Sequence, residues 1–155
     1  MLSSSEKLAQ RLAIGVPAVL LGGAYLSEYG FGLVPCEMCW WQRYAHFAAL
    51  GIALLSTVLA PKRVWIALAA LAIVAAGLIG GFHAGVEYGW WEGLTACSTP
   101  SLGGGDPLEA IMNAPLVRCD EVQWSLAGIS LAGWNFLVSS VSGIAILLLL
   151  RRKTR

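Results

Sequence analysis

The sequence has few charged residues. Of its 155 residues, only 10 are Lys or Arg and 9 are Asp or Glu, whereas 57% are hydrophobic. Together with a mean hydropathy of +0.70, this composition excludes an ordinary soluble domain and indicates that the chain is solvated by a lipid bilayer. The basic residues occur in short clusters that form no folded basic face, so we do not expect nucleic-acid binding.

Charged residues are absent altogether from four intervals, 12–27, 44–61, 64–86 and 122–150. Each interval approximates the roughly 20 residues of a membrane span. We therefore predict helices at about 8–27, 41–60, 64–88 and 129–150, with a short outer loop at 28–40 and a long outer loop at 89–128. The prediction is an all-α integral membrane four-helix bundle, a single transmembrane domain over 1–155. A cleaved signal peptide over 1–24 is the alternative for the first helix, and the three spans that follow favour a retained helix.

The basic residues predict the orientation of this bundle. Eight of the ten lie in the N-terminus, the 60–63 turn and the C-terminus: Lys7, Arg11, Lys62, Arg63, Arg151, Arg152, Lys153 and Arg155. Since basic residues near span ends stay in the cytoplasm, we expect both termini and this turn to be cytoplasmic. All four cysteines then face the outer compartment, which for a bacterial inner-membrane protein is the periplasm, where disulfides persist.

Cys36-Glu37-Met38-Cys39 is a Cys-x-x-Cys motif at the outer end of the second predicted helix. That end is the helix N-terminus, whose partial positive charge and free N–H groups stabilise a thiolate, the reactive form of cysteine. Arg43 follows Cys39 by four residues, so it shares the same face one turn deeper. A cation at this depth is costly unless it has a function. The alternative for Arg43 is an interfacial anchor beside the neighbouring aromatic residues.

The remaining cysteines, Cys97 and Cys119, are separated by 21 residues of the long outer loop. A structural disulfide is the ordinary interpretation of two such cysteines in an oxidising compartment. A second, more reactive pair at the same end of the bundle supplies the other components of thiol–disulfide exchange, so the four cysteines are also candidates for a relay.

Zinc binding by the four cysteines is disfavoured, because structural zinc sites usually have close Cys spacing in both halves. We predict no metal. The two histidines have other predicted roles: His46 shares a face with Arg43 and is expected to make a buried polar contact between helices. His83 precedes Glu87 by one turn, and either pairs with it or donates a hydrogen bond to a ligand.

Four segments of the chain resemble the DsbB family (disulfide bond formation protein B) over nearly the full length. They are Pro-Cys-Glu-Met-Cys-Trp-Trp-Gln-Arg at 35–43, Phe-His-Ala-Gly-Val-Glu at 82–87, Cys97, and Arg-Cys-Asp-Glu-Val-Gln-Trp-Ser-Leu at 118–126. The resemblance implies a four-helix membrane bundle that acts as a protein-dithiol:quinone oxidoreductase. It takes electrons from a DsbA-like periplasmic thiol oxidase and passes them to the membrane quinone pool, either ubiquinone or menaquinone.

The resemblance also implies a role for each site residue. Redox-active disulfides Cys36–Cys39 and Cys97–Cys119 are expected, with Cys97 attacked by the reduced partner and Cys119 engaging Cys36. Cys39 is expected to face the quinone, with Arg43 and His83 near its head group. Two alternatives stay open: a variant branch of the family that serves a dedicated partner, and a non-catalytic membrane scaffold with structural disulfides.

Two further patterns lead to predictions. Gly77, Gly81 and Gly85 form a small-residue stripe, which favours helix–helix contact, with a quinone lying against the bared backbone as the alternative. The segment 106–112 begins with Asp106-Pro107, a helix-start pattern, and is either a short helix on the membrane surface or an ordinary turn.

Overall fold

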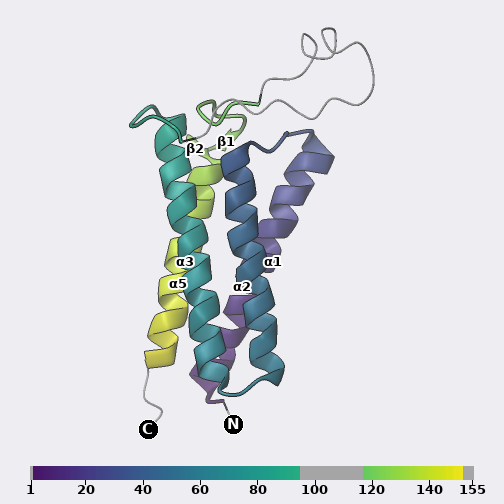
Figure 1. The fold of residues 1–155 in the computed structure, drawn as a ribbon, viewed down its shortest axis with the longest axis vertical. Helices are drawn as coiled ribbons and strands as arrows, with labels where there is room; N and C mark the ends of the chain where they lie inside the picture. The colour runs from purple at the N-terminus through teal and green to yellow at the C-terminus, as the bar shows by residue number, and fades with distance from the viewer. Residues whose placement is uncertain (1, 95–116, 152–155) are drawn as a thin grey trace.

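A computed structural model describes residues 2–94 and 117–151 of the chain (Figure 1). These ranges contain four long helices, α1 (Ser4–Phe31), α2 (Glu37–Val58), α3 (Lys62–Glu87) and α5 (Leu131–Arg151), and a short antiparallel hairpin of β1 (Ser125–Leu126) and β2 (Ile129–Ser130). The helical bundle expected from the sequence is confirmed. Cys97 and the segment 106–112 lie outside the described residues, so the predictions made for them stay predictions.

Three of these helices, α1, α3 and α5, are long and apolar enough to cross a membrane. Helix α2 is not among them, although it packs against α1 and α3 as part of the same bundle. The cause is visible in its sequence, because Gln42, Arg43 and His46 lower its hydropathy. All three side chains are buried within the protein, so α2 carries the polar residues of the bundle interior.

The helix boundaries differ from the predicted ones by up to four residues, and local chemistry explains the differences. Helix α1 begins at Ser4 because Ser3 and Glu6 form a capping box, and Gly32 ends it at φ 69°. Helix α2 begins at Glu37 because the Cys36 side chain caps it. The hairpin was not predicted. Its two-residue turn has positive φ at Ala127 and Gly128, as a type I′ turn requires, and it delays the start of α5 to Leu131.

Figure 1 places the start of α1, the end of α5 and the turn between α2 and α3 at one end of the bundle, and the hairpin at the opposite end. At the first end, Arg63 binds Glu6 of α1 at 3.1 Å and donates to the Leu150 carbonyl of α5. The start of α1, the end of α5 and the 60–63 turn therefore lie at the same end of the bundle. Which compartment each end faces stays a prediction.

The glycine stripe of α3 serves contact between protein segments. A Cβ atom at Gly77 would lie 2.8 Å from the Ser140 hydroxyl and 3.0 Å from its backbone nitrogen, and one at Gly81 would lie 2.8 Å from the Phe136 ring. At Gly85, the Trp91 ring occupies the space. Protein atoms fill the space beside all three glycines, so the idea that a quinone lies against this backbone was wrong.

We predict that Gly77→Ala destabilises the bundle by about 1–3 kcal/mol, because the added methyl group meets the α5 backbone. Gly15→Ala in α1 is the matched control, since a Cβ atom there meets nothing within 4 Å and is expected to stabilise the helix by about 0.5–1 kcal/mol. Unfolding by denaturing detergent in micelles measures both. Equal stability of Gly77→Ala and the parent protein would contradict the close packing of α3 and α5.

Candidate active site

The Cys36/Cys39 pair lies at the first turn of α2, as the sequence predicted. Cys36 is the N-cap residue, and its sulfur accepts a hydrogen bond from the Cys39 backbone N–H at 3.3 Å. The two sulfur atoms are 2.7 Å apart. Cys36 is buried, whereas Cys39 is half-buried. Cys39 is therefore the more exposed residue of the pair.

The reduced pair does not hold two equivalent thiols. The hydrogen bond with Cys39, followed by burial, raises the pKa of the Cys36 thiol to about 12, and the bond with His83 opposes this rise only in part. In the dithiol form, the proton shared between the two sulfurs thus outweighs the effect of the helix N-terminus on the pKa of Cys36. The Cys36 thiol keeps its proton because the Cys39 sulfur shares that proton and because the buried thiol is poorly solvated, which disfavours its charged form.

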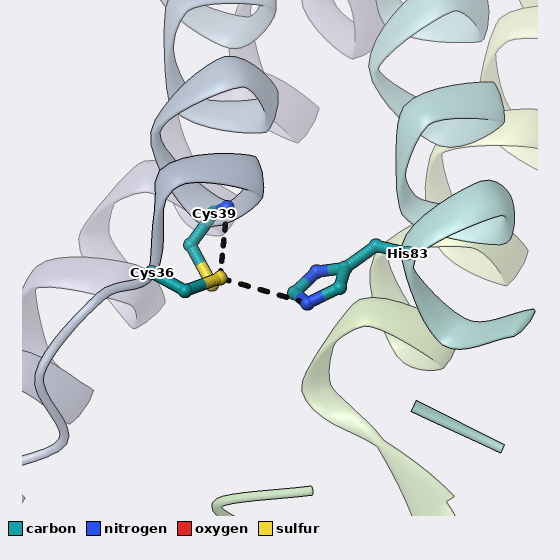
Figure 2. A group of neighbouring side chains, drawn as sticks. All are labelled: Cys36, Cys39 and His83. Atoms are coloured by element: carbon teal, nitrogen blue, oxygen red, sulfur yellow. Dashed lines mark hydrogen bonds between the residues drawn. The ribbon is translucent and has the colours of Figure 1, made fainter. Parts of the chain in front are cut away.

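His83 of α3 faces the pair across the bundle, as Figure 2 shows. Its Nε2 atom lies 3.5 Å from the Cys36 sulfur and 3.9 Å from a carboxylate oxygen of Glu87. The predicted contact between His83 and Glu87 along the helix is confirmed. The structure adds the contact with Cys36, which sequence spacing does not predict because the two residues are 47 positions apart.

Arg43 is buried, and its charge is compensated within the protein. Its guanidinium donates to the Glu28 carboxylate and to the Ala24 carbonyl of α1, the latter at 3.2 Å. It also lies 4.9 Å from the ring centroids of Tyr25 and Trp40. The Arg43 side chain is only 6% exposed, which disfavours the interpretation of Arg43 as an interfacial anchor. Glu28 was missed by the sequence reasoning.

Cys119 joins the first pair in one buried cluster. It packs with Cys36, Met38, Val86 and Val117. Nearby, the Gln123 side chain donates to the Val34 carbonyl at 2.9 Å, which holds the segment before the hairpin against the segment that precedes Cys36. The structure thus brings together three of the four predicted cysteines, Cys36, Cys39 and Cys119.

A cavity of about 370 Å³ opens beside the cysteine pair. Both cysteines, Arg43, His46 and His83 contribute to its lining, and most of the remaining lining is apolar side chain from α1, α5 and the segments joining the helices. Its size falls in the range of small-molecule sites, and a few polar groups on an apolar wall are typical of such sites.

A chain of hydrogen bonds inside the bundle contains residues that the sequence reasoning did not single out. Asn135 of α5 donates to Gln42 at 2.7 Å and contacts His46 at 2.9 Å, and Ser139 donates to Asn135 at 2.8 Å. The predicted interhelical polar contact of His46 is confirmed. The signal that could have revealed the others is an amide within an apolar span, because such a group needs a partner.

The site also has the donor atoms of a partial metal site. The Cys36 and Cys39 sulfurs and one His83 ring nitrogen all lie within 4.8 Å of one another. A closed structural zinc site takes four protein ligands, and within residues 2–94 and 117–151 this group has three. The geometry suits a thiol pair with a histidine beside it better than a structural zinc site.

A vicinal thiol pair at the end of a membrane helix, a histidine against its buried sulfur and an adjacent apolar cavity define a membrane thiol oxidoreductase. Comparison with known proteins gives the family. A model of the family described as "Disulfide bond formation protein DsbB" matches residues 6–149. The chain belongs to this family, and it is a membrane protein of disulfide bond formation.

Relatives named "Disulfide bond formation protein B" match over most of their length. The protein of Verminephrobacter eiseniae is 34% identical over 93% of this chain and 85% of its own. The protein of Polaromonas naphthalenivorans is 28% identical over 100% of this chain and 96% of its own. The protein of an Acidovorax species is 31% identical over 99% of this chain and 91% of its own. The search of solved structures gave no match.

We predict that a thiol reagent distinguishes the two cysteines of the reduced protein. Because the pKa of Cys36 is about 12, its alkylation rate should rise about tenfold per pH unit from pH 8 to pH 10, without levelling off near the ordinary value of about 8.5. Mass spectrometry of iodoacetamide-treated protein gives the rate at each cysteine. The denatured chain is the control, in which the Cys36 rate levels off near pH 9. Levelling off in the folded protein as well would contradict the assignment.

Proposed function

We propose that this chain is a protein-dithiol:quinone oxidoreductase. It reoxidises a DsbA-like thiol oxidase and passes the two electrons through Cys97/Cys119 and Cys36/Cys39 to a membrane quinone, ubiquinone or menaquinone. The single observation that carries the proposal is that the Cys36/Cys39 pair lines an apolar cavity of quinone-compatible size within the bundle. Membership of the DsbB family supports the same chemistry.

The relay between the cysteine pairs is supported by the position of Cys119, which packs in one buried cluster with Cys36. In the proposed order of steps, the reduced partner forms a mixed disulfide with Cys97. Once that mixed disulfide is resolved, the partner is oxidised, and Cys97 and Cys119 are both thiols. Cys119 then exchanges with Cys36. Each step forms one S–S bond and breaks another, so electrons are conserved until the Cys36/Cys39 dithiol is oxidised and the quinone is reduced to hydroquinone.

Three side chains are proposed to receive the quinone. Cys39 is the more exposed residue of the pair and lines the cavity, and we propose that its sulfur faces the ring. Arg43 lines the same cavity with a permanent cation suited to a polar ligand oxygen. His83 lines the cavity between the sulfur of Cys36 and the carboxylate of Glu87. The quinone, when bound, supplies the two-electron acceptor.

The proposed setting is the bacterial inner membrane. Both termini and the 60–63 turn are cytoplasmic, and the cysteines face the periplasm, where they meet the partner. The start of α1, the end of α5 and this turn lie at one end of the bundle, whereas the helix start that carries the cysteine pair lies at the other, and this supports the arrangement (Figure 1). The quinone pool reaches the cavity from the surrounding bilayer.

Quinone reduction tests the proposal directly. Purified protein in detergent should reduce a soluble ubiquinone analogue when a reduced DsbA-type protein is added, with the quinone absorbance as the readout. Cys36→Ser, Cys39→Ser, Cys97→Ser and Cys119→Ser should each abolish steady turnover, because each removes one sulfur of the relay. Failure of the intact protein to consume the quinone would refute the proposed activity.

A pair of variants tests the proposed role of Arg43. We predict that Arg43→Met raises the KM for the quinone analogue by about 10–100-fold, the usual effect of losing a hydrogen bond to a charged group. Glu28→Gln is the matched control, since it keeps the cation and removes only the partner charge. An unchanged KM in a folded Arg43→Met protein would assign Arg43 to helix packing alone.

A membrane scaffold that binds a metal is a second candidate, favoured by the gathering of Cys36, Cys39 and His83 donor atoms. Alkylation mass spectrometry separates it from the enzyme. In the enzyme, the oxidation state of the cysteines changes when a reduced partner or a quinone is added, whereas in the scaffold it does not. A variant-branch enzyme with a dedicated partner is a third possibility, and the rate with different DsbA-type proteins distinguishes it.

A further inference from the structure

The only two histidines of the chain are linked by two amide side chains that cross the bundle. Gln42 of α2 contacts the Nδ1 atom of His83 at 3.0 Å, and Asn135 of α5 contacts the Nε2 atom of His46 at 2.9 Å. The two amides meet where Asn135 donates to Gln42. Gly80 of α3 makes room for this contact, since a Cβ atom there would lie 2.9 Å from Asn135 and 3.1 Å from Gln42.

Two backbone carbonyls fix the orientation of both amides. Asn135 Nδ2 donates to the Ala76 carbonyl at 3.1 Å, and Gln42 Nε2 donates to the Met38 carbonyl at 3.2 Å. Because a carbonyl oxygen only accepts hydrogen bonds, the atom facing it must be the amide nitrogen. The same orientations satisfy the contact between the two amides, in which Asn135 donates its N–H to the Gln42 oxygen.

These orientations determine which nitrogen of His83 carries the proton. Gln42 presents an N–H to Nδ1, so Nδ1 must be the lone-pair nitrogen, and a neutral imidazole then has its hydrogen on Nε2. The Nε2 atom is the one that faces the Cys36 sulfur at 3.5 Å (Figure 2). His83 is therefore placed as a hydrogen-bond donor to this sulfur, and that nitrogen has no lone pair with which to remove the thiol proton.

The same reasoning applies to His46. Asn135 Oδ1 already accepts from the Ser139 hydroxyl at 2.8 Å, and as an oxygen it also accepts from His46, so the His46 proton is on Nε2. The Nδ1 atom of His46 is then the lone-pair nitrogen, and it is buried with no hydrogen-bond partner among residues 2–94 and 117–151. One asparagine thus determines the tautomers of both histidines.

We propose that Asn135 is a positioning residue that, through Gln42, holds His83 in the tautomer whose Nε2–H stabilises negative charge on the Cys36 sulfur. The inference rests on the proposed function, because it assigns this hydrogen bond to thiol–disulfide exchange at the Cys36/Cys39 pair. In the proposed relay, Cys119 first bonds to Cys36. When a second thiolate then bonds to the Cys119 sulfur, the Cys36–Cys119 bond breaks and Cys36 leaves with the electron pair. The Nε2–H of His83 stabilises that charge.

Nitrogen NMR of the purified protein with ¹⁵N-labelled histidine observes the tautomers directly. Two histidines give two sets of ring signals, and His46→Ala assigns them. In the parent protein, both imidazole rings should be protonated at Nε2 and unprotonated at Nδ1. Gln42→Glu and Asn135→Asp each replace an amide by a carboxylate of nearly the same shape, and Nδ1 of His83 should be protonated in both variants. Gln42→Glu places an acceptor beside Nδ1. Asn135→Asp removes the N–H that the Gln42 oxygen accepts, so the Gln42 oxygen turns toward Nδ1.

Gln10→Glu is the matched control for these variants, because Gln10 makes a comparable interhelical bond to Ser56 at the other end of the bundle. It should leave both tautomers unchanged. The inference would be overturned if Nδ1 of His83 were protonated in the parent protein. It would also be overturned if Nδ1 of His83 stayed unprotonated in the Gln42→Glu and Asn135→Asp proteins.

A rate measurement tests the donor role without any quinone. The oxidised protein is mixed with dithiothreitol, and reduction of the Cys36–Cys39 bond is followed by alkylation and mass spectrometry. His83→Leu should slow this reduction about 10–100-fold, whereas His83→Gln should keep most of the rate because an amide N–H replaces the Nε2–H. Equal losses in the two folded variants, or no loss in His83→Leu, would overturn the inference. Neither this rate nor the NMR result depends on quinone reduction, so failure of the proposed function is seen separately.

Discussion

Polar side chains in the interior of a membrane bundle must find their partners within the protein, because lipid offers none. This constraint organises α2, the helix whose buried residues include Gln42, Arg43 and His46. Arg43 is compensated by Glu28 of α1, while Gln42 and the Nε2 atom of His46 are hydrogen-bonded to Asn135 of α5. The polar contacts of α2 thereby fix the neighbouring helices around it, and the cysteine pair lies at the end of the helix that they hold in place.

The cysteine end of the bundle combines two requirements of thiol chemistry. One sulfur of the pair, that of Cys36, is buried against His83 and caps the helix, and the other, that of Cys39, lines the cavity beside it. The segment containing Cys119 is held at the same place by the buried cluster and by the bond from Gln123 to the Val34 carbonyl. A sulfur from the segment before the hairpin and an apolar cavity thus both lie beside the same pair, which is the arrangement that a relay from protein thiols to a membrane carrier needs.

Most of the fold could be predicted from the sequence because charged residues delimit the spans. The observed helix boundaries agree to within four residues with the boundaries predicted from the charge pattern. The positions of Cys36 and Cys39 at a helix start follow from their place before the second uncharged interval. The hairpin at 125–130 escaped prediction because its turn uses Ala127 at positive φ, a conformation that alanine rarely adopts and that no residue pattern signals.

The site was only partly predictable, for a different reason. Arg43, His46 and His83 could be selected because a charged or titratable group within a span is costly. Their partners could not, since Glu28, Gln42 and Asn135 lie on different helices and pair over long sequence separations, up to 93 residues between Gln42 and Asn135. Helical periodicity relates residues within one helix, whereas the hydrogen bonds that set the histidine tautomers depend on how three helices pack.

The central claim is that electrons enter the Cys36/Cys39 pair through Cys119. A Cys39→Ser, Cys97→Ser double variant leaves only Cys36 and Cys119, and mild oxidation followed by protease digestion and non-reducing mass spectrometry identifies any bond between them. The account predicts a Cys36–Cys119 disulfide within single protein molecules, formed rapidly because the two residues already pack in one cluster. If both cysteines stay reduced in the folded protein, or bond only between molecules, the relay does not pass through Cys119.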